Sequence, residues 1–310
     1  MRIDCFVRWL IAAALVVAPA AADAQIFRAY LSSSGNDSNP CTLPQPCRLM
    51  PAALAAVADG GEIWILNSAN YNASTVNISK SVSVLAEPGA IGSIVASGGP
   101  AITISGADVR VALTNLVIVP LPGAGGTFGV SVNSAAGALV VIDKVSFSRL
   151  PLDAVFVSTP ATVRISNSSF VDLGNNAIAI TAGATADISN VKMSGVSQFG
   201  VIVESSSGTT QAAVTDSTIV GASNCGLFSH TTGGTSQIFA TRTTISGSSG
   251  GACSQGGVAA LLSLNACSIQ GNTFGVVISD SSKMQTFSNN AILNNGTNVT
   301  NGSLTPATLQ

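Results

Sequence analysis

Apolar and polar residues alternate in short stretches that recur along most of the chain. One apolar position returns every 23 to 29 residues, and apolar residues also stand five and, with one exception, seven positions before it. The position between those two is mixed in character, which is typical of a strand with one buried face. A period of this size predicts a repeat architecture. The recurring position is held by Ile118, Phe147, Phe170, Met193, Ile219, Ile245, Ile269 and Ile292, and the last repeat places Gln285 and Phe287 in the strand.

Corners are predicted three residues before each recurring position. Asn tolerates the left-handed backbone region, and stacked Asn side chains can hydrogen-bond along a ladder. A further short strand follows each repeat, as at 154–157, 177–180, 200–203, 226–228 and 275–278. Short strands joined by such corners predict a parallel β-helix and do not fit a helical solenoid. The corner column reads Asn115, Lys144, Asn167, Asn190, Asp216, Arg242, Ala266 and Asn289.

The chain resembles the secreted bacterial parallel β-helix proteins of the pectin-lyase-like superfamily. Besides the repeats, the resemblance rests on the segment from Tyr30 to Cys41, on Pro46-Cys47-Arg48, on Gly60-Gly61-Glu62-Ile63, and on 78–82. It implies an all-β, single-stranded, right-handed β-helix whose N-terminal segment enters and caps the coil. It implies no particular reaction.

The N-terminal segment has its own helical pattern. Apolar residues between Arg48 and Ala58 fall on one face, and Gly60-Gly61 is expected to stop the helix. Such a helix would cover the open apolar end of the coil. The expected organisation is an N-terminal segment with a helical cap over 25–62, a β-helix over 63–299, and a polar tail over 300–310.

Residues 1–24 read as a secretory signal peptide. Arg2 and Arg8 precede a short apolar run at 9–17, and Ala22-Asp23-Ala24 has the form of a cleavage site. Export to the periplasm, cell surface or medium follows from this prediction. No later stretch is apolar enough for a transmembrane segment.

An exported chain permits disulfides. Cys41 and Cys47 bracket a stretch that must turn, so we expect them to be bonded. Of Cys225, Cys253 and Cys267 at least one lacks an intramolecular partner, and the pairing stays open. No Cys or His clusters near Cys41 and Cys47 to suggest zinc, and neither a metal nor a cofactor is predicted.

The composition bears on partners. The 310 residues hold 12 basic and 14 acidic side chains, a net charge of -2 with only 8% charged residues. A nucleic-acid-binding protein would carry a basic patch, so that class of partner is disfavoured.

Few residues are candidates for catalysis. His230, the only histidine, shares a repeat offset with Glu204, and both are placed in loops after a strand. Arg149 and Asp172 share another offset, as do two pairs interpreted as ordinary cross-strand contacts, Arg164 with Asp187 and Asp216 with Arg242. Glu204, His230, Arg149 and Asp172 are therefore weak catalytic candidates. No two acids stack on adjacent coils as a glycosidase needs, and most Phe residues are assigned to core columns.

Three functions fit these observations. The favoured one is a non-catalytic exported β-helix that binds a polysaccharide or cell-surface glycan, or adheres to other surfaces. The first alternative is a divergent polysaccharide lyase or hydrolase, which would use the charged columns. The second is a structural component of the cell envelope.

Overall fold

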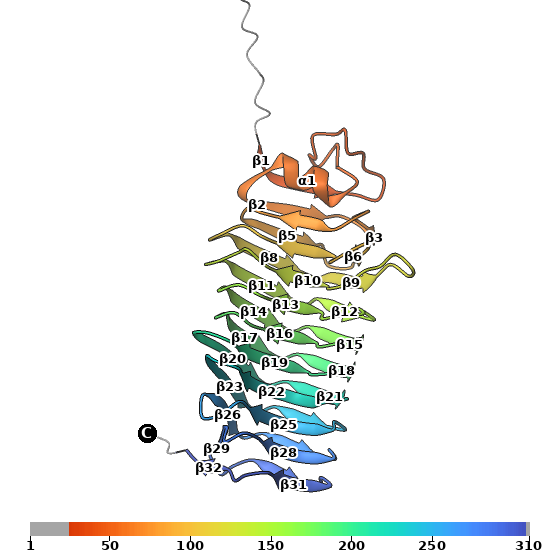
Figure 1. The fold of residues 1–310 in the computed structure, drawn as a ribbon. Coiled ribbons are helices and arrows are strands. Elements are labelled where there is room, and N and C mark those ends of the chain that lie inside the picture. The colour runs from red at the N-terminus through yellow and green to blue at the C-terminus, as the bar shows by residue number, and fades with distance from the viewer. Residues whose placement is uncertain (1–24, 308–310) are drawn as a thin grey trace, which may run out of the picture.

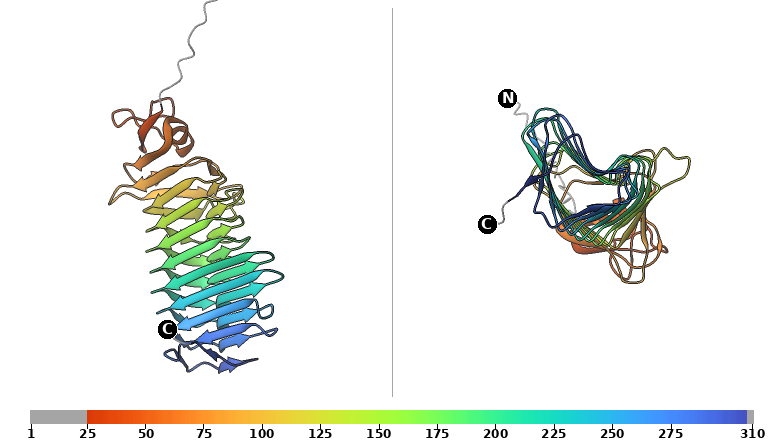
Figure 2. Two further views of the ribbon diagram at one scale, coloured as in Figure 1. Left: turned by 90° about the vertical axis from the view of Figure 1, so that its left-hand side faces the viewer. Right: turned by 90° about the horizontal axis from the view of Figure 1, so that it is seen from below.

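The computed structural model describes residues 25–307, which form one elongated parallel β-helix (Figure 1). The predicted signal peptide at 1–24 lies outside the described residues. In most coils the chain passes once through each of three sheets, named A, B and C below, and the strands pair in parallel with their equivalents on neighbouring coils. Seen along the axis, the coils superimpose closely (Figure 2). The predicted all-β solenoid is confirmed.

The strands of each sheet are short. Sheet A contains β1 (Ile26–Leu31), β2 (Val57–Ile65), β5 (Val82–Ala86), β8 (Arg110–Thr114), β11 (Leu139–Asp143), β14 (Thr162–Ser166), β17 (Thr185–Ser189), β20 (Thr209–Thr215), β23 (Thr235–Thr241), β26 (Ala260–Asn265), β29 (Lys283–Thr286) and β32 (Thr305–Pro306). Sheet B contains β3 (Ala69–Asn70), β6 (Gly92–Ala96), β9 (Leu116–Pro120), β12 (Ser146–Ser148), β15 (Ser169–Leu173), β18 (Lys192–Val196), β21 (Thr218–Ala222), β24 (Thr244–Ser246), β27 (Ser268–Gln270) and β30 (Ala291–Leu293). Sheet C contains β4 (Val76–Ile78), β7 (Ile102–Ile104), β10 (Val130–Val132), β13 (Val155–Val157), β16 (Ile178–Ile180), β19 (Val201–Ser205), β22 (Cys225–Thr231), β25 (Gly250–Gln255), β28 (Phe274–Ile278) and β31 (Thr297–Thr300).

The core is a set of stacked apolar columns inside the coil. The recurring sequence position is one of them: Phe147 pairs with Phe170, Phe170 with Met193, and Ile245 with Ile269. The rings of Phe147 and Phe170 stack in the interior with 5.0 Å between centroids. Burying such large side chains contributes about 1.5–3 kcal/mol each, so the columns carry much of the stability.

The corners between sheets A and B have the predicted backbone. Asn115, Asn167 and Asn190 take positive φ angles of 57°, 50° and 50°. Asn190 Nδ2 donates to Asn167 Oδ1 at 2.7 Å, and Asn167 Nδ2 donates to Asp143 Oδ1 at 2.6 Å. The predicted ladder is present over these coils, where each amide satisfies a neighbour's polar group.

The last coil departs from the predicted register. Leu262 pairs with Met284, not Gln285, and the positive φ falls on Ser288 instead of Asn289. One extra residue therefore lies between the corner and Ile292, which still pairs with Ile269. Spacing alone could not reveal this, because the extra residue is absorbed in a polar turn.

The coil also continues into the expected tail, since β31 pairs with β28 and β32 pairs with β29.

Helix α1 (Met50–Ala56) lies at the N-terminal end of the solenoid (Figure 1). It is shorter than the predicted 48–58, with a proline near its start and Val57 already extended. Val57 begins β2 and pairs with Ile26, so Gly60 and Gly61 lie in a strand and do not end the helix. Met50, Ala53 and Leu54 are buried against the core. Within residues 25–307 no helix combines the length and apolar character that crossing a bilayer requires.

Candidate functional site

The outer face of sheet C is apolar over its middle coils, although it points away from the core. In β13, Val155 and Val157 join the interior and Phe156 between them points outward. The equivalent outward positions on successive coils pair in register. They are Asn77, Thr103, Ser131, Phe156, Ala179, Ile202, Phe228, Cys253, Val277 and Thr300, so the apolar part extends from Phe156 to Val277.

Two pairs of phenylalanines stack on this face. Phe128 lies parallel to Phe156 with 5.1 Å between centroids, and Phe199 lies parallel to Phe228 at 4.6 Å. In both pairs the first ring precedes a strand and the second sits in the middle of the strand on the next coil. The rings are half-buried, so part of each remains available for contact.

A hollow of about 320 Å³ opens beside the second pair. Phe199, Phe228 and Phe274 supply its apolar walls, together with the Cys225–Cys253 disulfide. Polar groups from several coils complete the lining: Asn224, Ser249, Ser254, Gln255 and Ser279. Apolar walls with a few convergent polar groups are typical of a ligand site.

A row of polar side chains follows the same strands. The Glu204 carboxylate accepts a hydrogen bond from His230 Nδ1 at 3.1 Å, and Gln255 Nε2 donates to Asp280 Oδ2 at 2.9 Å. The His230 ring also stacks on Phe228 with 5.4 Å between centroids. Glu204 and His230 are register partners within β19 and β22. The expectation that they lie in loops is wrong, because both strands extend beyond their apolar centres.

The other charged columns lie away from sheet C. Arg149 and Asp172 line a separate shallow hollow where strands β12 and β15 of sheet B end. They make no ion pair in the described structure. Arg164 and Asp187 are register partners in sheet A without an ion pair. Arg242 donates two hydrogen bonds to Asp216, at 2.6 and 2.7 Å, and these hold the pKa of that carboxyl below its ordinary value.

The cysteines divide between the two ends of the coil. Cys41 and Cys47 form the expected disulfide near the N-terminus, and Cys225 and Cys253 form a second one across adjacent coils of sheet C. Among residues 25–307, Cys267 is the one free thiol; it is buried, and burial raises its pKa. Among residues 25–307 no three His, Cys, Asp or Glu side chains gather in a way that could hold a metal ion.

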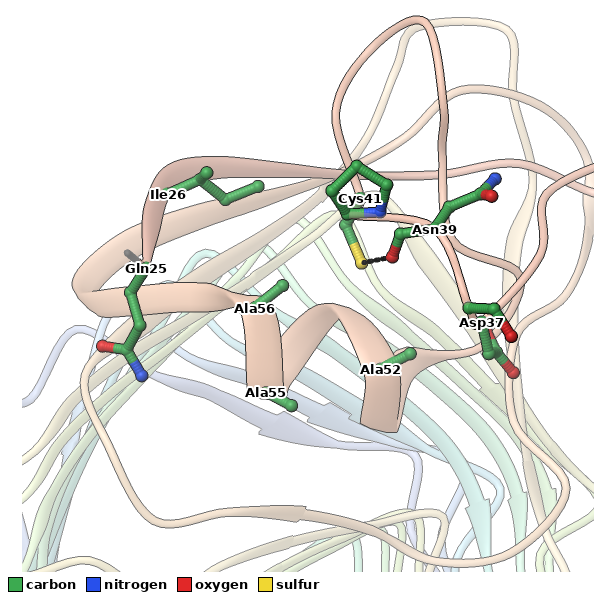
Figure 3. Close-up of a pocket in the computed structure, with 10 residues that line it drawn as sticks. Gln25, Ile26, Asp37, Asn39, Cys41, Ala52, Ala55 and Ala56 are labelled. Atoms are coloured by element: carbon green, nitrogen blue, oxygen red, sulfur yellow. Dashed lines mark hydrogen bonds between the residues drawn. The ribbon is translucent and has the colours of Figure 1, made fainter. Parts of the chain in front are cut away.

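A larger hollow of about 470 Å³ lies at the N-terminal end (Figure 3). Its walls include Ile26, the Cys41 disulfide and alanine methyl groups of α1. The one carboxylate, Asp37, accepts hydrogen bonds from the backbone amides of Arg48 and Leu49 at 2.8 and 2.7 Å. Asp37 therefore holds this loop on the helix, and no other carboxylate lines the hollow.

The aromatic residues on sheet C are what sequence reasoning missed. The expectation that most Phe residues fill core columns is wrong: of the ten at positions 27–287, only Phe147 and Phe170 are fully buried. In Val155-Phe156-Val157 and Leu227-Phe228 all residues are apolar, so hydropathy alone does not show which one points outward. The useful signal is the alternation itself, which places the central residue opposite its two inward neighbours.

Fold and site together define a parallel β-helix protein with an aromatic-lined outer face. A family model described as the right-handed β-helix region matches residues 128–305, and the chain belongs to this family. No curated protein sequence matches the chain.

Solved structures share the fold at low sequence identity. An alginate lyase from Paenibacillus sp. str. FPU-7 is 13% identical with a TM-score of 0.54, and the match covers 82% of this chain and 99% of the lyase. The pectate lyase Pel9A is 14% identical with a TM-score of 0.54, covering 85% and 75%. The tailspike protein of Acinetobacter phage vB_ApiP_P1 is 13% identical with a TM-score of 0.51, covering 73% and 48%.

Proposed function

We propose that this protein is an exported, non-catalytic glycan-binding β-helix and that it binds its ligand on the outer face of sheet C. The observation that carries the proposal is the stacked Phe199–Phe228 pair beside a hollow with polar groups. A sugar ring has a face of C–H groups and a rim of hydroxyls. The negative face of an aromatic ring attracts the C–H groups, while side-chain amides and hydroxyls can pair with the rim.

The hydrogen-bonding groups stand where that arrangement requires them. Asn224, Ser249 and Gln255 lie around the same hollow as the rings, all three are exposed, and each can donate and accept. Asn224 and Ser249 stand just before β22 and β25, which are register partners on adjacent coils, and Gln255 ends β25. The site is therefore rigid before a ligand arrives, which lowers the entropic cost of binding.

Two other observations support the proposal. An alginate lyase and a pectate lyase are among the proteins that share this fold. The two disulfides agree with export, since such bonds persist in oxidising compartments.

A second candidate is a carbohydrate-active enzyme. It is favoured by the Glu204–His230 hydrogen bond, because a carboxylate that orients an imidazole is a common acid–base arrangement. The pair lies next to Phe228 at the edge of the proposed binding face.

The binding proposal can be tested by affinity electrophoresis of residues 25–310 in gels containing single polysaccharides. We expect retardation by at least one polysaccharide and a loss of about 2- to 10-fold in affinity for Phe228→Ala. Phe274→Ala should also lower the affinity, and the fold should tolerate this change because the Phe274 ring is more exposed. The matched control is Phe239→Ala, since Phe239 is 42% exposed on sheet A. Equal retardation of all four proteins would overturn the proposal.

The enzyme candidate has its own test. Purified protein is incubated with the same polysaccharides, and new reducing ends and unsaturated uronide absorbance are measured. Product that disappears in Glu204→Gln and in His230→Ala would replace the binding proposal with the enzymatic one. We expect no product from any of these proteins.

A further inference from the structure

From the distribution of charge over the solenoid, we infer that sheet C binds uncharged glycans and discriminates against polyuronates. This inference rests on the proposed function and names its ligand class. It concerns a face that combines aromatic rings, a hollow and polar side chains.

Sheet C carries no cation on any of its described strands. The ten Lys and Arg residues at positions 25–307 lie instead in the N-terminal segment, on sheets A and B or at their ends, and in one turn. They are Arg28, Arg48, Lys80, Arg110, Lys144, Arg149, Arg164, Lys192, Arg242 and Lys283.

Several of these cations are already engaged. Arg28 forms an ion pair with Glu62 at 2.7 Å and lies over the Trp64 ring. Arg242 is bonded to Asp216 at the corner of sheets A and B. Lys80 follows the first strand of sheet C, but its ammonium group donates to the carbonyl of Val57.

The ionisable groups that sheet C does present are mostly acidic. Glu204 and Asp280 project from its polar row, and His230 is the one base beside them, already bonded to Glu204. A uronate carboxylate placed on the aromatic rings would meet these acids with no cation to compensate it. Like charges brought together, with the loss of hydration on both, oppose binding.

A neutral glycan is not repelled by these acidic side chains. Its hydroxyl groups can donate to the Glu204 and Asp280 carboxylates and accept from the Gln255 amide, so the same acids become useful partners. Phe156 and Phe228 are three coils apart along the sheet. At about 4.8 Å a coil, the two aromatic pairs are separated by about 14 Å, which favours an extended chain over a single sugar.

The test compares xylan and glucan oligosaccharides with oligomers of alginate and polygalacturonate by titration calorimetry. At pH 8, where an ordinary histidine is neutral, we expect a neutral oligosaccharide to bind about tenfold or more tightly than any uronate at low salt. Added salt should leave the affinity for neutral oligosaccharides unchanged. It should raise the affinity for uronates and so narrow the difference between the two affinities.

Charge variants give the sharper result. Gln255→Lys should introduce uronate binding that salt weakens, and Glu204→Gln combined with Asp280→Asn should narrow the preference for neutral ligands. Gln270→Lys is the matched control, because Gln270 is also an exposed glutamine at the end of a strand, but on sheet B. The control should leave both affinities as in the wild type.

The outcomes separate the two proposals. If uronate oligomers bind as tightly as neutral ones, and if Phe228→Ala abolishes that binding, this inference is overturned while the glycan-binding site is supported. Binding that survives Phe228→Ala and Phe274→Ala, or binding to no polysaccharide at all, would overturn the proposed function and this inference with it.

Discussion

The ring of Phe199 lies parallel to the ring of Phe228 on the next coil, with 4.6 Å between centroids and 17° between planes. Phe128 and Phe156 repeat this relationship three coils earlier, with 5.1 Å and 14°. The coil period thus places two similar aromatic platforms in one line. A solenoid produces such repetition because each coil positions equivalent residues at the same angle around the axis.

The Phe199–Phe228 stack should also contribute to stability. A double-mutant cycle of Phe199→Ala and Phe228→Ala, followed by urea denaturation, should give a coupling energy of about 1 kcal/mol. A parallel cycle with Phe239→Ala in place of Phe228→Ala should be additive, because Phe239 lies on sheet A. Additivity in the first cycle would mean that the two rings do not support each other.

The two disulfides should stabilise the protein unequally. Cys225–Cys253 closes a separation of 28 residues and Cys41–Cys47 closes one of 6. In the chain-entropy account, removing the first should lower the free energy of unfolding by about 3.5 kcal/mol and removing the second by about 2 kcal/mol. Paired Cys→Ala variants in non-reducing urea would measure this, and the reverse order would contradict it.

Asn167 should be the preferred residue at its corner. It has a φ of 50°, donates to Asp143 and accepts from Asn190. Asn167→Ala should destabilise the protein by about 1–2 kcal/mol, since alanine disfavours this backbone region and makes no ladder contact. Asn167→Gly restores the backbone freedom alone, so thermal denaturation should place it between alanine and wild type. Equal melting temperatures for the alanine and glycine variants would exclude a backbone contribution.

Asp153 should make stability depend on pH. Its side chain is buried before β13 and accepts hydrogen bonds from Asn175 Nδ2 and the Asn176 amide, at 2.7 and 3.0 Å. Burial raises its pKa above the ordinary 3.8. The folded protein therefore holds this proton more tightly, and its stability falls as pH rises from about 3.8 through the raised value. As pH rises over that interval, the free energy of unfolding of Asp153→Asn should increase relative to that of the wild type.

Asp216 supplies a comparison of opposite sign. Its pKa is lowered by Arg242, so the contribution of this pair is present above pH 3.8 and is lost as pH falls. Asp216→Asn should therefore lose stability relative to wild type as pH rises, by a small amount because the pair is exposed. Urea denaturation of both variants between pH 2 and pH 8 would check the two signs, and parallel profiles would contradict the assignment.

Prediction from the sequence succeeded where the repeat was regular. The columns from Ile118 to Ile292 pair as expected because the inward positions of these strands bury apolar side chains, so a shift by one residue would expose them. It failed in the last coil, where one extra residue shifts Met284 and Ser288 into the expected places of Gln285 and Asn289. It also placed Glu204 and His230 in loops, because strand length beyond an apolar centre leaves no hydropathy signal.

Spacing and residue type alone predict the repeat, the positions of the inward columns, the Asn corners and the pairing of Glu204 with His230. Only the stacking of the coils shows which cysteine stays free, which outward phenylalanines stack in pairs, and that the rings, the Cys225–Cys253 bond and the polar groups surround one hollow. The physical reason is that sequence spacing fixes the height of a residue along a solenoid. Alternation within a strand gives the inward or outward direction of its side chain, but its neighbours on other coils depend on the register in which the coils stack.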